Sequence, residues 1–255
     1  MAEHTKTEQN IHLILSRMED LADKAARTGV AVSKFLTPAE AHSVAEHFRH
    51  KRTGLSFDGA IDGAERVRAV FVNPDWGECA RDELFTALKI SYRQQDALSH
   101  RDILGALMAL GIERDVVGDI VCGEGAATLV CLPELGGYIT ENLTKAGRVG
   151  VTVSAIGLDK LPVKQEELTI KTDSVASLRL DAVLCAAFGL PRTKAAELIS
   201  SGRVNLDYQV CQQSAKELSA GALLSVRGFG RAKLMEIGGA SRKGRIFVRI
   251  GIYGR

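Results

Sequence analysis

The chain has 255 residues, of which 45% are hydrophobic and 25% charged, and its formal net charge is +2. Its apolar runs are far shorter than the roughly 20 residues that span a bilayer, and its first ten residues lack the apolar core of a signal peptide, so we expect a cytoplasmic protein with no membrane partner. Its five cysteines are widely spaced and never form a C-x-x-C pair, so the sequence indicates neither a disulfide framework nor a cysteine zinc site.

The first segment, residues 1–64, is expected to be helical. Apolar residues recur at helical spacing from Glu8 to about Gly29, and a second helix is predicted over residues 37–48. Thr37, Pro38 and Glu40 have the pattern of a capping box with proline at the first helical position. The histidines in or just after this helix, at positions 42, 47 and 50, are not spaced to ligate a metal together, so we expect no metal.

Residues 65–172 alternate between short β-rich runs and helical runs. A strand is expected at 66–74, followed by the order βαββαβ over segments 88–94, 98–112, 118–123, 127–133, 135–147 and 150–156. That order predicts a ferredoxin-like split βαβ fold, which is shared by RNA-recognition-motif (RRM) domains and by many unrelated proteins. The aromatic run with which RRM domains stack bases is absent, because only Tyr92 lies in the relevant strand.

The run "SHRD" begins the first helix of this βαββαβ order. Ser99 and Asp102 are spaced as a capping box, which explains both residues without catalysis. His100 and Arg101 remain candidates for contact with a phosphate at the helix start.

The third segment, residues 173–255, is strongly basic. It carries 13 Lys and Arg against 6 Asp and Glu, a net charge of +7, whereas residues 1–172 carry 20 against 25, a net charge of −5. The polar run that ends near residues 172–174 marks the boundary. Such an excess favours a polyanionic partner, most simply nucleic acid, and the alternative is a solvated basic surface.

Two amphipathic helices are predicted to open this segment. The first carries one apolar stripe and ends at Gly189, the second begins at Pro191, and the stripe comprises Leu180, Val183, Leu184, Ala187 and Phe188. The second helix starts with Arg192 and Lys194, although a cation in a first turn costs roughly 0.3–1 kcal/mol. A phosphate bound at that helix start would offset this cost.

Further cations follow in the β-rich remainder. A glycine-flanked turn carries Arg227 and Arg231, and Gly228 and Gly230 would let a sugar-phosphate chain approach closely. The alternative is an ordinary β-turn with solvated arginines. The other basic residues here are Lys233, Arg242, Lys243, Arg245 and Arg249.

The stretch "LRLDAVL…LPRTKAAELISSGRVNLD…GALLSVRGFGR" resembles an S4 RNA-binding domain. The segment "LSHRDILGALMALGIERDVVGDI" is similar to the central part of YlmH-type S4 proteins, which join a helical N-terminus, an RRM-like middle domain and a C-terminal S4 domain. The resemblance implies an α+β protein with a helical region at 1–64, an RRM-like domain at 65–172 and an S4 (αL-like) domain at 173–255.

The resemblance also implies which residues face RNA. They are Arg179, Arg192, Lys194, Arg203, Arg227 and Arg231, with Phe229, Lys233, Arg242, Lys243, Arg245, His100 and Arg101 as possible additional contacts. Three positions depart from the usual S4 pattern: Asp207 replaces asparagine, Ala222 replaces an acid, and Phe229 replaces a basic residue. The hairpin of Asp207 is therefore expected to point away from RNA, and Phe229 to stack on a base.

The implied function is binding of large-subunit ribosomal RNA and tRNA on 50S particles in ribosome-associated quality control, without a cofactor or a small-molecule substrate. One rival is an RNA-modifying enzyme, although no G-x-G-x-x-G fingerprint is present and "GEGAA" at 123–127 is typical of a hairpin turn. The other rival is a protein-interaction module with a basic face. From the residues alone, only the binding of structured RNA is predicted.

Overall fold

The computed structural model describes residues 2–51, 53–163, 168–241 and 244–254, with side chains from residue 10 onward. The chain forms two compact units, residues 1–165 and 166–255, and each is described by itself. Among the described residues, no helix combines the length and the apolar character needed to cross a membrane.

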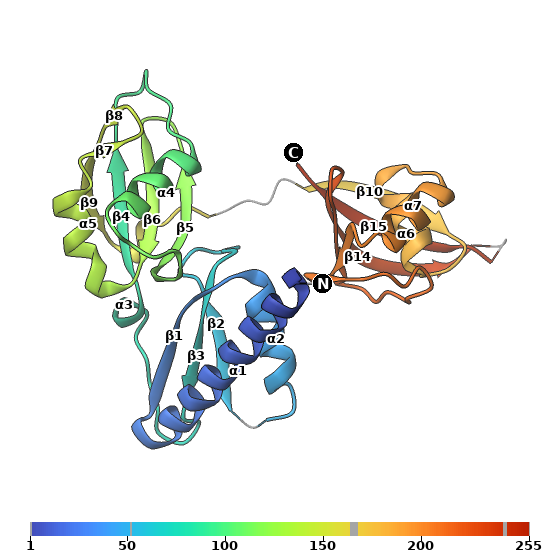
Figure 1. The fold of residues 1–255 in the computed structure, drawn as a ribbon, viewed down its shortest axis with the longest axis horizontal. Helices are drawn as coiled ribbons and strands as arrows, with labels where there is room; N and C mark the ends of the chain where they lie inside the picture. Colours follow the sequence, from blue (N-terminus) through green and yellow to red (C-terminus); the bar gives the residue numbers. More distant parts are fainter. Residues whose placement is uncertain (1, 52, 164–167, 242–243, 255) are drawn as a thin grey trace. The chain divides into compact units, whose positions relative to one another are not determined.

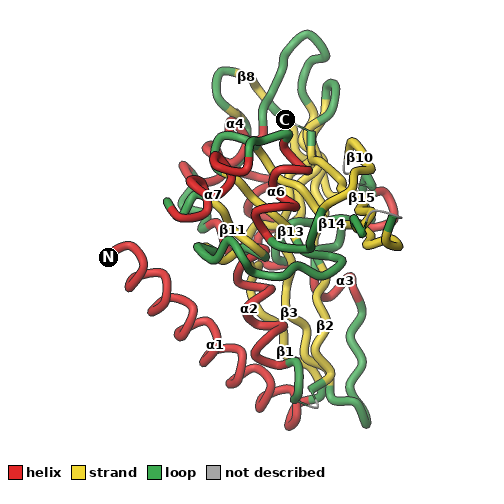
Figure 2. The backbone as a smooth tube through the Cα atoms, turned by 90° about the vertical axis from the view of Figure 1, so that its right-hand side faces the viewer, coloured by secondary structure: helices red, strands yellow, loops and turns green. Residues whose placement is uncertain are grey.

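The N-terminal part of the first unit is a three-stranded antiparallel sheet of order β1-β3-β2 with two helices against it (Figures 1 and 2). Its elements are α1 (Ala2–Thr28), β1 (Val30–Leu36), α2 (Pro38–Phe48), β2 (Gly54–Asp58) and β3 (Val67–Val72). Met18 of α1 and Phe48 of α2 bury their side chains against Phe71 of β3. The predicted capping box is confirmed: Thr37 Oγ1 accepts from the amide of Glu40, whose carboxylate accepts from the amide of Thr37.

This region is not purely helical, which corrects the expectation for residues 1–64. The strands β1 and β2 were not predicted, and β3 was assigned to the middle domain although it is the central strand of the N-terminal sheet. The reason is that β3 pairs with β1 on one edge and with β2 on the other. Strand partners are chosen by contacts distant in sequence, which hydrophobic periodicity does not report.

The middle part has the predicted order βαββαβ, which is confirmed. Its elements are β4 (Thr86–Ser91), α4 (His100–Ala109), β5 (Val117–Cys122), β6 (Ala126–Cys131), α5 (Gly136–Asn142) and β9 (Thr152–Ile156). The sheet order is β5-β6-β4-β9 with every neighbouring pair antiparallel, as in ferredoxin-like folds. Helices α4 and α5 bury Ile103, Leu107 and Ile139 against one face of this sheet. Shorter elements complete the unit: α3 (Arg81–Leu84), β7 (Lys145–Ala146), β8 (Val149–Gly150) and the 3-10 turns Arg114–Val116, Pro133–Leu135 and Leu158–Lys160.

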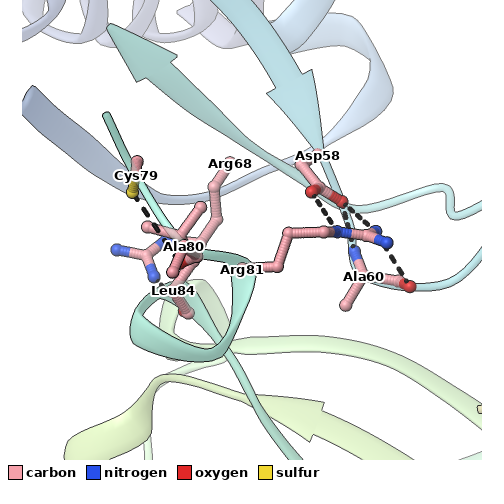
Figure 3. Close-up of polar contacts among 7 residues, drawn as sticks. All are labelled: Asp58, Ala60, Arg68, Cys79, Ala80, Arg81 and Leu84. Carbon is pink, nitrogen blue, oxygen red and sulfur yellow. Dashed lines mark hydrogen bonds and ion pairs between the residues drawn. The ribbon is translucent and has the colours of Figure 1, made fainter. Parts of the chain in front are cut away.

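The N-terminal sheet and the middle sheet share a core, and α3 is fixed between them by arginines (Figure 3). Arg81 forms two 2.7 Å bonds to the carboxylate of Asp58, and buried Arg68 donates to the carbonyls of Ser33 and Leu84. Partial burial raises the pKa of Asp58, but the bonds from Arg81 and from the amide of Ala60 outweigh it and hold that pKa below its ordinary value. The first unit is therefore a single packed body.

The second unit is a six-stranded antiparallel sheet of order β10-β15-β14-β13-β11-β12 with two helices on one face (Figure 1). Its elements are β10 (Leu168–Val175), α6 (Leu180–Phe188), α7 (Arg192–Ser200), β11 (Val204–Leu206), β12 (Gln209–Val210), β13 (Leu223–Val226), β14 (Gly230–Ala240) and β15 (Ile246–Tyr253). Leu184 of α6, Leu198 of α7 and Leu234 of β14 are fully buried in its core.

The expected boundary at residue 173 falls inside β10 and is too late. All eight residues of β10 pair with β15, from Leu168 opposite Tyr253 to Val175 opposite Ile246. The polar composition that suggested a linker belongs to an edge strand, because its outward residues face solvent on one side of the sheet.

Candidate nucleic-acid interface

The helix pair α6–α7 is built as its sequence predicts. The apolar stripe of α6 is buried except for Phe188, which is partly buried. Gly189 ends the helix at φ 65° and ψ 33°, the left-handed conformation that glycine adopts without steric cost. Pro191 precedes the first turn of α7, which buries Ala195, Leu198 and Ile199 against α6. The first turns of both helices are thereby held rigidly at one end of the unit.

A carboxylate that sequence reasoning missed lies between the two helix starts. Asp181, whose side chain is 6% exposed, accepts from Nε and Nη2 of Arg179 at 3.1 and 3.0 Å and from Nη2 of Arg192 at 3.4 Å. Partial burial raises the pKa of Asp181, but the hydrogen bonds and charges of Arg179 and Arg192 outweigh it and lower that pKa. The sequence could have indicated this carboxylate, because Asp181 lies two residues after Arg179 and outside the apolar stripe of the helix.

This arrangement changes the explanation for the cations at the start of α7. Arg192 is paired with Asp181 within the fold, although its side chain is 69% exposed, and Lys194 forms 3.0 Å bonds to Glu197 one turn later. A bound phosphate is therefore not needed to account for their positions. Both side chains still reach solvent, and the Lys194–Glu197 pair, in which both partners are exposed, contributes roughly 0–1 kcal/mol.

Four of the predicted contact residues meet in one groove of about 890 Å³. Arg203, Arg227, Phe229 and Arg231 line it together with Asn205 and Ser225, two polar residues that the sequence did not single out. Arg203 donates from Nη2 to the carbonyl of Arg227 at 3.2 Å, which fixes the loop after α7 against the β13–β14 turn.

The glycines of that turn are required by its backbone. Gly228 has φ 90° and Gly230 has φ 111°, values that residues with a side chain rarely adopt. A Cβ at Gly228 would lie 3.7 Å from Arg203 Nη2, an ordinary van der Waals contact, so the backbone angle and not crowding requires glycine there. The turn thus presents backbone and guanidinium groups side by side.

Arg231 extends the groove onto the outer face of the sheet. Its guanidinium carbon lies 4.8 Å from the centre of the Tyr253 ring, a cation–π contact that holds the side chain flat. Lys233 follows two residues later in β14 and therefore points to the same face. Cross-strand pairing places Ser225 opposite Arg231.

Another group of candidates lies around a smaller hollow of about 360 Å³ that Arg192 and Arg245 line. Nε of Arg245 donates to Ser174 Oγ at 3.0 Å, and its Nη2 donates to the Ser174 carbonyl. The predicted contacts Arg242 and Lys243 lie outside the described residues.

The structure gives physical reasons for the three departures from the S4 pattern. Asp207 adopts φ 47° in the β11–β12 turn, and its Oδ1 accepts from the amide of Leu223 at 2.8 Å, a bond that an asparagine oxygen would make equally well. Ala222 is buried, where an acid would lose its hydration. Phe229 is half-buried, with its ring centre 6.2 Å from that of Phe188, so part of its surface is already used in packing.

His100 and Arg101 belong to the first unit, at the start of α4. The predicted capping box is confirmed, because Ser99 Oγ accepts from the amide of Asp102 and Asp102 accepts from the amide of Ser99 at 2.9 Å. The bonds from the Ser99 hydroxyl and amide lower the pKa of Asp102. Among the described residues, no group of three or more His, Cys, Asp or Glu side chains is placed to hold a metal ion.

Two family models match the chain in the regions just described. One, described as the putative RNA-binding domain in YlmH, matches residues 82–160, and the S4 domain model matches residues 178–224. A solved structure described as cell division protein ylmH from Streptococcus pneumoniae has a TM-score of 0.51 at 18% identity over 59% of this chain and 94% of its own, a likeness of fold. The chain is also 32% identical over 217 residues, 83% of each protein, to the ribosome-associated protein quality control protein P2 of Bacillus subtilis. At that identity and coverage, the chain belongs to the YlmH family of S4-domain proteins.

Proposed function

We propose that this protein binds large-subunit ribosomal RNA and tRNA on the 50S ribosomal subunit in the cytoplasm, as a non-catalytic factor in the quality control of stalled nascent chains. The observation that carries the proposal is the groove lined by Arg203, Arg227 and Arg231 in a unit whose net charge is strongly positive. Clustered guanidinium groups beside exposed backbone amides suit the phosphates of a folded RNA.

The family relationship supports the ribosomal setting. The relative is named for ribosome-associated protein quality control, and one matched model is described as a putative RNA-binding domain while the other is the S4 domain. The residues proposed to contact RNA in the second unit are those of the groove, Arg203, Arg227, Phe229, Arg231 and Lys233, and those around the helix starts, Arg179, Arg192, Lys194 and Arg245.

Co-sedimentation with purified 50S subunits tests the proposal. The intact chain is expected to pellet with the particles in low salt, and Arg203→Glu with Arg227→Glu is expected to abolish pelleting. The melting temperature is expected to fall by only a few degrees, because both side chains are exposed and one hydrogen bond, from Arg203 to the Arg227 carbonyl, is lost. Lys216→Ala is the matched control, since Lys216 is an exposed cation of the same unit that lines neither hollow.

Three results would overturn the proposal. If the charge-reversed variant pellets like the wild type, the groove is not the RNA-binding surface. If pelleting survives nuclease removal of exposed RNA, the basic face meets protein, as in a protein-interaction module. Methyl transfer or uridine isomerisation by the purified protein would instead show an RNA-modifying enzyme.

A further inference from the structure

The middle domain of the first unit has a sheet face and a helical face, and the two differ in how much of each is covered by the rest of the unit. The sheet face opposite α4 and α5 is the one with which RRM domains stack bases. Here it is partly covered, because Phe35 and Val70 of the N-terminal sheet pack on Val130 of β6. Its uncovered part carries the aligned polar residues Lys89, Thr128 and Ser154 and no aromatic ring. This face is poorly suited to base stacking.

The helical side of the same domain has a groove of about 530 Å³ between α4 and the loop that leads into β7. Its α4 wall includes the small residues Gly105, Ala106 and Ala109. Its opposite wall includes Asn142 at the end of α5, Thr144, and Lys145 at the start of β7. Arg101 stands at the N-terminal end of the α4 wall. The groove therefore has small residues along α4 and a cation on each wall.

The two cations are available for a ligand. Arg101 and Lys145 are both exposed, and neither forms an ion pair within the described part of the chain. The acid that lines the groove, Asp102, is bonded to Ser99 as the helix cap, and the charge of Arg101 helps to lower its pKa, so Arg101 has a neighbouring carboxylate although no ion pair joins them. Arg148 adds an exposed cation in the β7–β8 turn, which lies against the first turn of α4: a Cβ at Gly147 would sit 3.5 Å from Asp102 Oδ1.

Gly105 is the least expected residue of this surface. A glycine inside a helix is less favourable than alanine, and a Cβ built at Gly105 would meet no atom within 4 Å. Packing within the described chain therefore does not require glycine at this position. The absence of a side chain at Gly105 leaves space at the α4 wall of the groove for a molecule from outside.

We infer that this groove binds the backbone of double-helical RNA, as a second RNA-binding surface separate from that of the second unit. Arg101 and Lys145 contact phosphates, the small residues of α4 let the sugar-phosphate chain approach, and the amide oxygen of Asn142 accepts from ribose 2′-hydroxyls. Double-helical RNA is recognised largely through phosphates and 2′-hydroxyl groups, which needs no aromatic platform. The inference rests on the proposed RNA-binding function and adds the face through which the middle domain takes part.

Salt-dependent binding of the full chain to an RNA duplex of about 20 base pairs, longer than the roughly 16 that double-stranded-RNA-binding domains span, tests the inference. Arg101→Gln with Lys145→Gln removes both charges while keeping a polar side chain at each position. It is expected to lower the slope of log affinity against log salt by roughly 1 to 2 and the affinity by about tenfold. Lys89→Gln is the matched control on the sheet face and is expected to change neither. The inference is overturned if the double variant binds like the wild type, or if Lys89→Gln has the larger effect.

A steric pair of variants tests the groove without changing charge. Gly105→Leu places a large side chain on the α4 wall of the groove and is expected to weaken duplex binding several-fold. The protein is expected to melt no lower than the wild type, because leucine is a better helix former than glycine. Gly105→Ala adds one methyl group and is expected to melt higher and to bind within about twofold of the wild type. Unchanged binding by Gly105→Leu would rule out a close approach of RNA at α4.

The variants in the α4 groove and those in the second unit test two different proposals. If Arg203→Glu with Arg227→Glu leaves duplex and 50S binding intact, the proposed function of the second unit fails whatever the groove variants do. If those C-terminal changes weaken binding and the Arg101 and Lys145 changes do not, only the present inference fails.

Discussion

Asp181 and Arg192 form an ion pair across the junction of α6 and α7, with Oδ2 3.4 Å from Nη2. The same carboxylate also binds Arg179 through two hydrogen bonds. One buried acid therefore orients two of the cations proposed to face RNA. The cations gain a fixed position, and the helix start gains a negative charge where the macrodipole favours one.

Asp181→Asn is expected to destabilise the second unit by about 1–2 kcal/mol, because the amide nitrogen cannot accept from Arg179 and the two cations lose their shared counter-charge. Urea unfolding monitored by circular dichroism measures this. Glu236→Gln is the control, since the ion pair of Glu236 with Arg249 is between two exposed side chains and its loss is expected to change the free energy of unfolding very little. Equal midpoints for Asp181→Asn and wild type would show that the carboxylate has no structural role.

The contribution of Asp181 to stability is expected to disappear in acid. Its folded-state pKa is lowered below the ordinary value of about 3.9 by Arg179 and Arg192. The folded protein therefore binds this proton more weakly than the unfolded chain, so the stabilisation is fully present above about pH 4 and is lost as pH falls through the folded pKa. The difference in unfolding free energy between wild type and Asp181→Asn should shrink below pH 4. If this difference stays constant down to the acid transition, the lowered pKa of Asp181 is contradicted. The pH dependence that Asp58 contributes is the same in both proteins and therefore does not affect the difference.

Arg192→Glu is expected to melt lower than the wild type, even though an acid normally suits the first turn of a helix. The new carboxylate would face Asp181, which is buried and already negative. Arg192→Ala is expected to melt within a few degrees of the wild type, since the side chain is largely exposed, and to reduce the salt slope of RNA binding by roughly 1. A higher melting temperature for Arg192→Glu would mean that the helix dipole outweighs the ion pair.

A fragment of residues 166–255 is expected to fold alone and to keep its RNA binding, because it contains its own core and a complete sheet. A fragment of residues 173–255 lacks Leu168, Thr169, Ile170, Lys171 and Thr172, five of the eight residues of β10 that pair with β15. It is expected to melt markedly lower or not to fold. Circular dichroism melts of the two fragments decide the point, and equal stability would show that β10 is dispensable.

Local spacing in the sequence determined a large part of this protein. The caps formed by Thr37 with Glu40 and by Ser99 with Asp102, the helix end at Gly189 and the order βαββαβ all follow from interactions within a few residues, and the structure has each of them. The S4 and YlmH resemblance is carried by the same local motifs, and the matched domain models confirm it.

Contacts distant in sequence were decided only by the tertiary structure. The placement of β3 between β1 and β2, and of β10 along the whole of β15, depends on strand pairing that no local pattern specifies. The ion pair of Asp181 with Arg192 also needed the fold, because the residue types predict charge but not which opposite charge a side chain meets. The groove between α4 and Lys145 was missed for the same reason: its two walls come from elements more than 30 residues apart, and only packing brings them together.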